Sequence, residues 1–164
     1  MQHYLQLFKS LYESRVEYLV CGGLAVNIYG IPRMTADIDL MLRFSPDNLK
    51  KFREVTTTLS YNACIPVDIE KLADESVRKD MVEKKNLIAY SYYNSIASFM
   101  NLDILVKTPN DFDHFWANKE TRDIEDFEVY LVSLQNLIDM KKYAGRGQDE
   151  QDIQLLYRLG NLND

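Results

Sequence analysis

Apolar residues recur along this chain with two spacings, one typical of helices and one typical of strands. Near the start, Leu5, Phe8, Leu11 and Tyr12 follow helical spacing, which predicts an amphipathic helix over residues 4–14. Shorter runs rich in β-branched and other apolar residues predict strands. The predicted strands cover residues 17–21, 37–42, 87–92, 99–106 and 127–131, with a further short strand inside 59–67.

Glycine and capping residues mark where the other predicted helices begin and end. Gly22 and Gly23 allow a sharp turn before a short helix over residues 24–29, which Gly30 ends. Ser45 is the predicted cap of the next helix. Further helices are predicted over 69–82, after Asp111, from Ser133 to near Gly145, and over 149–159. Strands and helices do not alternate strictly, which favours an α+β fold over a doubly wound parallel sheet.

Composition and charge limit the classes of function. The length of 164 residues predicts a single domain over 1–164, and 46% apolar with 27% charged residues is typical of a globular protein. The net charge of −6 argues against a protein that coats nucleic acid. No signal peptide or membrane-spanning run is evident, so we expect a cytoplasmic protein without membrane contact. Cys21 and Cys64 are expected to be free thiols.

Two aspartates in the predicted strand 37–42 carry the strongest chemical signal. Asp37 and Asp39 are one residue apart, so their side chains share one face of the strand while Ile38 points to the other. Two carboxylates in one place repel each other, and they are tolerated where they share a cation or both reach water. Carboxylate oxygens are suitable ligands for Mg²⁺.

The surrounding sequence supplies the other parts of a phosphate-transfer site. Gly22 and Gly23 allow backbone amides to approach an anion closely. A third carboxylate beside the pair would act as a metal ligand or as the base for an incoming hydroxyl. Asp103, in a predicted strand, is the preferred candidate, and Asp68 is its competitor. Together these elements outline nucleotidyl transfer from a nucleoside triphosphate.

These motifs resemble a known family. Gly22-Gly23, followed after thirteen residues by Asp37-Ile38-Asp39, is similar to the signature of the DNA polymerase β-type nucleotidyltransferase superfamily. The block Arg33–Leu40 (Arg-x-Thr-x-Asp-Ile-Asp-Leu) resembles that of its small bacterial members, which include the abortive-infection toxins of type IV toxin–antitoxin systems. The segment Leu137–Arg146, with Asp149 and Asp152 after it, is similar to the closing helices of those proteins.

The resemblance implies a nucleotidyltransferase-like mixed β-sheet flanked by helices, with further helices at the C-terminus. It implies transfer of a nucleoside monophosphate from a nucleoside triphosphate, with Mg²⁺ as the cofactor. The implied roles are catalysis and metal binding for Asp37, Asp39 and Asp103, and nucleotide binding for Gly22, Gly23, Arg33 and Lys141. The implied acceptor is a hydroxyl or phosphate on tRNA, a small molecule or a partner protein, and an antitoxin is a possible second partner.

Several alternatives stay open at this level. Many members of the family have Ser where this chain has Gly23, so the alternative function is a catalytically weak or inactive binding module. Arg33 could pair with a neighbouring carboxylate, and Lys141 could occupy a solvated helix position. Arg146 is expected in a structural ion-pair cluster with Asp149 and Asp152. Three tyrosines could stack on a base, although packing is the expected role: Tyr90, Tyr92 and Tyr93.

Overall fold

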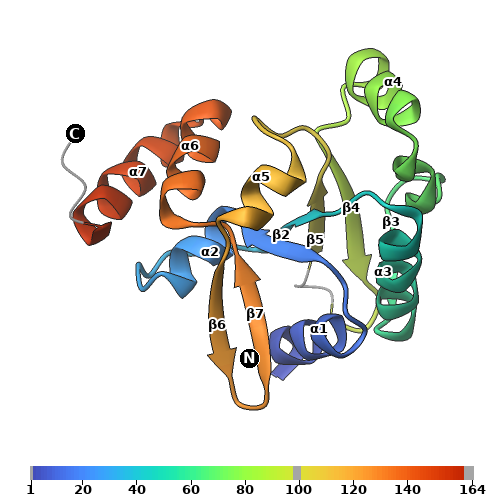
Figure 1. Ribbon diagram of the computed structural model, residues 1–164, viewed down its shortest axis with the longest axis horizontal. Helices are drawn as coiled ribbons and strands as arrows, with labels where there is room; N and C mark the ends of the chain where they lie inside the picture. Colours follow the sequence, from blue (N-terminus) through green and yellow to red (C-terminus); the bar gives the residue numbers. More distant parts are fainter. Residues whose placement is uncertain (1, 98–100, 161–164) are drawn as a thin grey trace.

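A computed structural model describes residues 2–97 and 101–160 of the chain (Figure 1). Within these residues, seven strands form one mixed sheet in the order β3-β4-β5-β2-β1-β7-β6. The strands are β1 (Tyr18–Cys21), β2 (Asp37–Leu42), β3 (Tyr61–Ala63), β4 (Ala89–Asn94), β5 (Asn101–Leu105), β6 (Glu120–Ile124) and β7 (Phe127–Leu131). The helices are α1 (Gln2–Glu13), α2 (Gly22–Ile28), α3 (Pro46–Thr58), the 3-10 helix η1 (Ile69–Ala73), α4 (Glu75–Lys85), α5 (Phe112–Ala117), α6 (Leu134–Ala144) and α7 (Gly147–Gly160).

Strand β2 lies at the centre of the sheet and pairs with strands of both directions. It runs antiparallel to β1 and parallel to β5. On the far side of β1, strand β7 is parallel to it, and the hairpin of β6 and β7 forms one edge of the sheet. Strands β3 and β4 form the other edge as an antiparallel pair. The mixed directions confirm the predicted α+β class.

The apolar core is one cluster that joins the sheet face toward α1 and α3 with buried residues of α2, α5, α6 and α7. Ile38, Leu40, Leu102 and Ile104 alternate along β2 and β5 and are fully buried. Helix α1 packs against β7 and α3, whereas α6 packs against α2 and α7 (Figure 1). Burying each of these branched side chains stabilises the fold by about 1.5–3 kcal/mol. The residues between them in β2 and β5 therefore point to the opposite face.

The predicted helix caps are present. The Ser45 hydroxyl accepts a hydrogen bond from the backbone N–H of Asn48, and Pro46 occupies the first turn of α3. Ser133 caps α6 in the same way, and α6 ends at Gly145 in the left-handed conformation, with φ of 62°. These local signals depend on a few neighbouring residues, which is why the sequence alone reveals them.

Several predicted elements differ from the structure. The helix predicted over 24–29 runs from Gly22 to Ile28, so the glycine pair forms its first turn instead of preceding it. The helix expected over 69–82 is divided into η1 and α4, because the carboxylate of Asp74 caps α4 by accepting from the backbone N–H groups of Ser76 and Val77. Strand β4 lies two residues further along than the predicted 87–92. Of the strand predicted over 99–106, residues 99 and 100 lie outside the described part of the chain.

Strand β6 was not predicted. Its sequence, Glu-Thr-Arg-Asp-Ile, has one apolar residue in five, so it has no strand-like apolar pattern. It exists because it pairs with β7 through a tight turn in which Glu125 has a φ of 54°. An edge strand needs pairing on one side only, which makes such a polar sequence acceptable.

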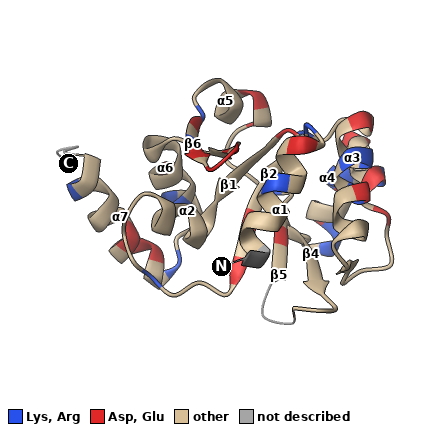
Figure 2. Cartoon of the chain, turned by 90° about the horizontal axis from the view of Figure 1, so that it is seen from below, with Lys and Arg blue, Asp and Glu red and all other residues tan. Residues whose placement is uncertain are grey.

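Charged residues of both signs are interleaved over the helices α1, α3 and α4 (Figure 2). This distribution agrees with a surface that is solvated rather than dedicated to a polyanion. Within residues 2–97 and 101–160, no helix has the length and apolar character needed to cross a membrane.

Candidate active site

A row of side chains crosses four neighbouring strands on the face opposite the α1–α3 core. The register aligns Cys21 of β1 with Asp39 of β2, and Asp39 with Asp103 of β5. On the next strand, Ser91 of β4 is aligned with Asp103. Side chains that are aligned across adjacent strands share a face and lie close together. The sheet therefore brings Asp39 and Asp103 together from positions 64 residues apart in the chain.

A second row lies one step along the same face. Asp37 is two residues before Asp39 in β2 and aligned with Asn101 of β5. The Asn101 side-chain amide donates a hydrogen bond of 3.1 Å to Asp37 Oδ1. This contact orients one of the two carboxylate oxygens of Asp37. The prediction that Asp37 and Asp39 share one face of a strand is consistent with this register.

Gly22 lies directly against the carboxylate of Asp39. A Cβ atom built on Gly22 would lie 1.9 Å from Asp39 Oδ2 and 2.5 Å from its Cγ. The φ of Gly22 is +61°, in the left-handed region that favours glycine. Both observations explain why α2 begins with glycine, and they place the first turn of α2 beside the carboxylate row.

The environment of Asp39 disfavours its charged form. Burial raises the pKa of this carboxyl from 3.8 to about 6, and the neighbouring charges of Asp103 and Asp37 act in the same direction. A hydrogen bond from the Gly23 backbone N–H and the charge of Arg146 act against this rise in pKa. Asp39 is thus partly desolvated and close to two other carboxylates. A bound cation would stabilise its charged form and offset both effects.

The three carboxylates fit a divalent cation by chemistry rather than by a preformed cage. In the described residues, no set of three His, Cys, Asp or Glu side chains is arranged closely enough to hold a metal ion. The donors are nevertheless hard oxygens, and the register of β2 and β5 aligns Asp39 with Asp103, with Asp37 two residues before Asp39 on the same face. Mg²⁺ commonly binds one or two carboxylates and takes its other ligands from substrate phosphates and water. The residues present suit that mode of binding.

Arg33 and Lys141 converge on the same carboxylate beside this site. Lys141 Nζ lies 2.7 Å from Asp152 Oδ2 and 3.2 Å from Asp149 Oδ1, and the guanidinium of Arg33 is also paired with Asp152. Lys141 and Asp152 are only 5% and 4% exposed. The cluster ties α6 and α7 to the segment before β2. The ion pair considered for Arg33 is therefore present, and the solvated position considered for Lys141 is not.

Lys141 lies near the end of β1 despite these ion pairs. Burial raises the pKa of the Cys21 thiol, the charge of Asp39 raises it further, and the charge of Lys141 lowers it. Cys21 directly precedes Gly22, so the residue on which the charge of Lys141 acts lies next to the start of α2. Its predicted contact with nucleotide phosphates stays a prediction.

Arg146 has a different place from the expected one. Its backbone N–H donates to Asp149 Oδ2, but Lys141 and Arg33 form the ion pairs of the cluster. The side chain of Arg146 is exposed, and its charge lowers the pKa of Asp39. The left-handed turn at Gly145 sets the direction of residue 146 and could be predicted from the sequence. Which groups lie opposite the Arg146 side chain depends on the tertiary fold, so the sequence did not reveal its orientation toward Asp39.

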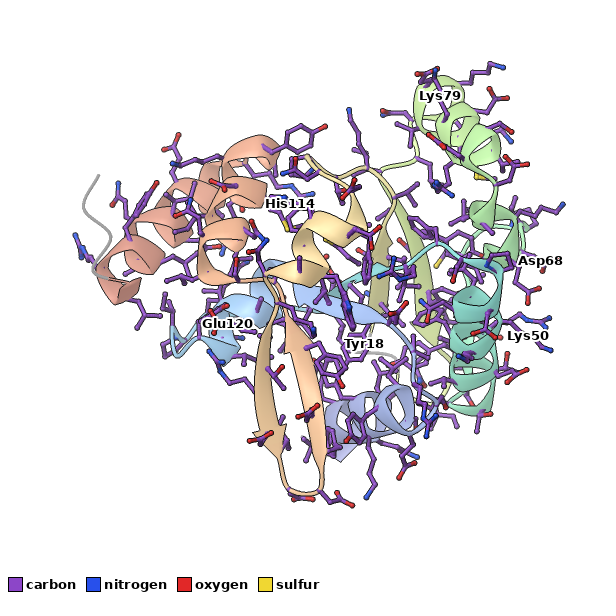
Figure 3. The ribbon with its side chains drawn as sticks, viewed as in Figure 1. Tyr18, Lys50, Asp68, Lys79, His114 and Glu120 are labelled. Atoms are coloured by element: carbon purple, nitrogen blue, oxygen red, sulfur yellow. The ribbon has the colours of Figure 1, made fainter. Side chains whose placement is uncertain are left out.

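Asp68, the competing third carboxylate, lies elsewhere. It precedes η1, and Figure 3 shows it at the edge of the molecule beside α3, away from β2. The register of β2 and β5 brings Asp103, not Asp68, beside Asp39. Of the three tyrosines considered for stacking, Tyr90 and Tyr92 are buried in the core, whereas Tyr93 is 48% exposed. Tyr93 is two residues from Ser91 in β4, so it shares the face of the carboxylates.

A cavity of about 420 Å³ lies between α3, β3 and β4. Its lining includes Arg53, Thr56 and Tyr92 and none of the predicted site residues. The candidate site lies on the other face of the sheet, where Asp37, Asp39 and Asp103 are each half-buried.

The fold of this chain is that of the nucleotidyltransferases. The chain is similar to the lincosamide antibiotic adenylyltransferase LnuA in a lincomycin-bound crystal structure, with 14% identity, 96% of each chain covered and a TM-score of 0.62. It is also similar to ANT(2'')-Ia in complex with adenylyl-2''-tobramycin, with 12% identity, 96% of this chain and 88% of that chain covered, and a TM-score of 0.58. An antigenic nucleotidyltransferase-like protein from Paracoccidioides brasiliensis matches at 17% identity, over 96% of this chain and 73% of that chain, with a TM-score of 0.55. At these identities the likeness shows the fold alone.

The family follows from the sequence model that matches almost the whole chain. Residues 6–160 match the family described as nucleotidyl transferase AbiEii toxin, type IV TA system. The chain belongs to this family, and the resemblance to nucleotidyltransferase toxins is confirmed. Membership of this family makes it a nucleotidyltransferase enzyme. No curated protein sequence matches the chain.

Replacing Gly22 by alanine tests the contact with Asp39. We expect the added methyl group to displace the Asp39 carboxylate and to strain the backbone at φ +61°. Nucleotidyl transfer should fall by about 100-fold, and the free energy of unfolding by about 1–3 kcal/mol. Transfer rates and urea denaturation measure the two effects.

Gly30→Ala is the matched control. Gly30 also has a positive φ, +99°, but a Cβ atom there meets nothing within 4 Å. The control should lose stability from backbone strain while keeping its transfer rate. Equal loss of transfer in both variants would contradict the proposed contact between Gly22 and Asp39.

Proposed function

We propose that this nucleotidyltransferase moves a nucleoside monophosphate from a nucleoside triphosphate to an acceptor, with Mg²⁺ bound by Asp37, Asp39 and Asp103. The single observation that carries the proposal is the register that aligns Asp39 with Asp103 on the face where Gly22 touches Asp39. Three carboxylates and a glycine pair that begins a helix are the groups that this reaction needs. We treat residues 1–164 as one domain of this type.

The glycine pair and two cations form the proposed nucleotide half of the site. Gly22 and Gly23 would present backbone amides to the triphosphate, because neither carries a side chain to keep phosphate oxygens away. Arg33 and Lys141 would contact the same phosphates. In the protein without triphosphate, Asp152 pairs with both cations and holds them at this place. The attraction of these cations to the phosphates would then compete with their ion pairs, to Asp152 for both and to Asp149 for Lys141.

The proposed metal ligands, Asp37, Asp39 and Asp103, would hold Mg²⁺ next to the triphosphate. Bound Mg²⁺ would neutralise charge on the triphosphate and stabilise the leaving pyrophosphate. Asp103 also has a second proposed role, acceptance of the proton from the entering hydroxyl. The hydroxyl proton would pass to Asp103, the new bond would form to the α-phosphorus, and the bond to pyrophosphate would break.

The direction of attack indicates where the acceptor lies. Entering and leaving oxygens are roughly in line in phosphoryl transfer. With pyrophosphate held near α2, the acceptor would approach from the side of β5 and β4, where Ser91 and Tyr93 share the face of the carboxylates. Strands β3, β4 and β5 contain no Lys or Arg, and Asp103 is their only charged residue.

Three acceptor classes remain under this proposal: tRNA, a small molecule and a partner protein. The lack of positive charge on β3–β5 favours a small hydroxylated molecule over a polyanion. Two similar structures hold such compounds, namely adenylyl-2''-tobramycin and lincomycin. Membership of a type IV toxin family supports a role as the toxin of a toxin–antitoxin pair, with an antitoxin as partner. Because the reaction consumes nucleoside triphosphates, we propose the cytoplasm as its location.

Pyrophosphate release tests the proposed function. The protein is incubated with each of the four nucleoside triphosphates, Mg²⁺ and members of the three acceptor classes. We expect release that requires Mg²⁺ and falls by about 100- to 1,000-fold in Asp103→Asn. Asp68→Asn is the matched control and should retain the full rate, because Asp68 lies beside η1.

Two results would contradict this proposal. One is pyrophosphate release at the same rate in EDTA, which would remove the need for a divalent ion. The other is triphosphate binding without transfer to any acceptor, which would favour a binding module.

A further inference from the structure

The space beside Gly23 is filled by a residue to which no role has been assigned, Thr35. A Cβ atom built on Gly23 would lie 2.7 Å from Thr35 Oγ1, 3.0 Å from Thr35 Cβ and 3.2 Å from Arg33 Cζ. The first distance is one that real Cβ atoms essentially never show. Glycine at position 23 is therefore what allows the Thr35 hydroxyl and the Arg33 guanidinium to lie against the start of α2.

The segment that carries Thr35 is held at both sides. The backbone N–H of Arg33 donates to Asn27 Oδ1 of α2 at 2.8 Å, and the Arg33 guanidinium is paired with Asp152. Two residues after Thr35, strand β2 begins at Asp37. The hydroxyl is thus fixed between the glycine pair and the first of the carboxylates, without being part of either.

The Thr35 hydroxyl makes a long and therefore weak hydrogen bond in this structure. It donates to the backbone carbonyl of Asp37 at 3.2 Å, whereas O–H···O hydrogen bonds are ordinarily 2.5–3.0 Å long. A hydroxyl has one proton and two lone pairs, and its proton rotates toward the better acceptor. A phosphoryl oxygen is charged and makes a stronger hydrogen bond than a backbone carbonyl.

We infer that the Thr35 hydroxyl binds a phosphoryl oxygen of the nucleoside triphosphate. This inference rests on the proposed function, in which the triphosphate lies over Gly22 and Gly23. Thr35 then supplies the side-chain hydroxyl that glycine at position 23 cannot supply, and Arg33 supplies a positive charge next to it. The ligand class is the triphosphate group, irrespective of the base.

Two substitutions at Thr35 separate the hydroxyl from the shape of the side chain. Thr35→Val keeps the shape and removes the hydroxyl, whereas Thr35→Ser keeps the hydroxyl. Calorimetry in Mg²⁺ with the tightest-binding nucleoside triphosphate should show about 10- to 100-fold weaker binding by Thr35→Val and wild-type binding by Thr35→Ser. The matching nucleoside, which has no phosphate, should bind all three proteins equally.

A role limited to the fold would give another pattern. It would lower the unfolding temperature of Thr35→Val and change the affinities for triphosphate and nucleoside by the same factor. Wild-type triphosphate affinity in Thr35→Val, or equal loss for both ligands, overturns the inference. Absence of triphosphate binding by the wild-type protein instead overturns the proposed function itself, so the two failures are distinguishable.

A paired substitution provides an independent test. Gly23→Ser alone should weaken triphosphate binding, because its Cβ meets Thr35 Oγ1. Gly23→Ser combined with Thr35→Gly removes both Thr35 atoms that this Cβ meets and returns one hydroxyl to the site. We expect the double variant to bind triphosphate at least about 10-fold more tightly than Thr35→Gly alone. Affinity no better than that of Thr35→Gly overturns the inference, and circular dichroism verifies that each variant is folded.

Discussion

Replacement of Asp39 by asparagine is expected to slow nucleotidyl transfer strongly and, at the same time, to stabilise the metal-free protein. The loss of transfer follows from the proposed role of Asp39 as a metal ligand, and we expect a decrease of about 100- to 1,000-fold. The gain in stability follows from the apoprotein. Asparagine has the shape of aspartate without the charge that burial and two neighbouring carboxylates oppose.

The pH dependence of this stabilisation has a definite sign. The pKa of Asp39 is raised from 3.8 to about 6 on folding, so the folded chain holds the proton more tightly than the unfolded chain. Protonation of Asp39 therefore favours folding below about pH 4, and this contribution is lost as the pH rises through 6. At pH 8 the full shift corresponds to a cost of about 3 kcal/mol in the wild-type apoprotein.

Urea denaturation in EDTA measures this effect. Asp39→Asn should be more stable than the wild type by about 1–3 kcal/mol at pH 8 and close to it at pH 3.5. Asp123→Asn, an exposed position on β6, is the control and should change stability by less than about 0.5 kcal/mol at either pH. An Asp39→Asn protein that is less stable than the wild type at pH 8 would show that the carboxylate is not strained in the apoprotein.

Asp152→Ala is expected to have the largest destabilising effect. The substitution leaves the Lys141 ammonium with Asp149 alone and removes the ion pair of the Arg33 guanidinium. The Lys141 and Asp152 side chains are each 6% exposed, so water cannot replace the lost carboxylate. Breaking a buried pair by removing one partner typically costs about 3–5 kcal/mol. The free energy of unfolding in urea should fall by this amount.

An exposed ion pair on α4 is the matched control. Lys84 and Asp80 are 71% and 62% exposed, and removal of Asp80 by alanine should cost no more than about 0.5 kcal/mol. A cost below about 1 kcal/mol for Asp152→Ala would mean that the two cations find other partners. The cluster would then not hold α6 and α7 against the segment before β2.

The local part of the site could be predicted from the sequence. Asp37 and Asp39 share a face because every strand alternates, whichever strands lie beside it. The glycine pair, the Ser45 cap and the Gly145 turn are likewise short-range features. The family was recognisable for the same reason, since its motif lies within Gly22–Leu40.

The long-range part of the site could not be derived from pattern alone. The sequence favours Asp103 over Asp68 because Asp103 lies in a predicted strand, but it does not place that strand next to β2, because strand order is decided by the packing of the whole sheet. The partners of Lys141 were also hidden, since Asp149 and Asp152 follow it at spacings that suit either solvent or a buried pair. Thr35 was within the recognised motif, but only the distance to Gly23 gives it a role.

The central claim is that a divalent ion and a triphosphate meet at the row of carboxylates beside α2. Crystals grown with Mn²⁺ and a non-hydrolysable nucleoside triphosphate test it directly, because Mn²⁺ can be located by its anomalous scattering. We predict Mn²⁺ among Asp37, Asp39 and Asp103, with the triphosphate over Gly22 and Gly23. Mn²⁺ and triphosphate bound elsewhere, for example in the cavity between α3, β3 and β4, would contradict the account.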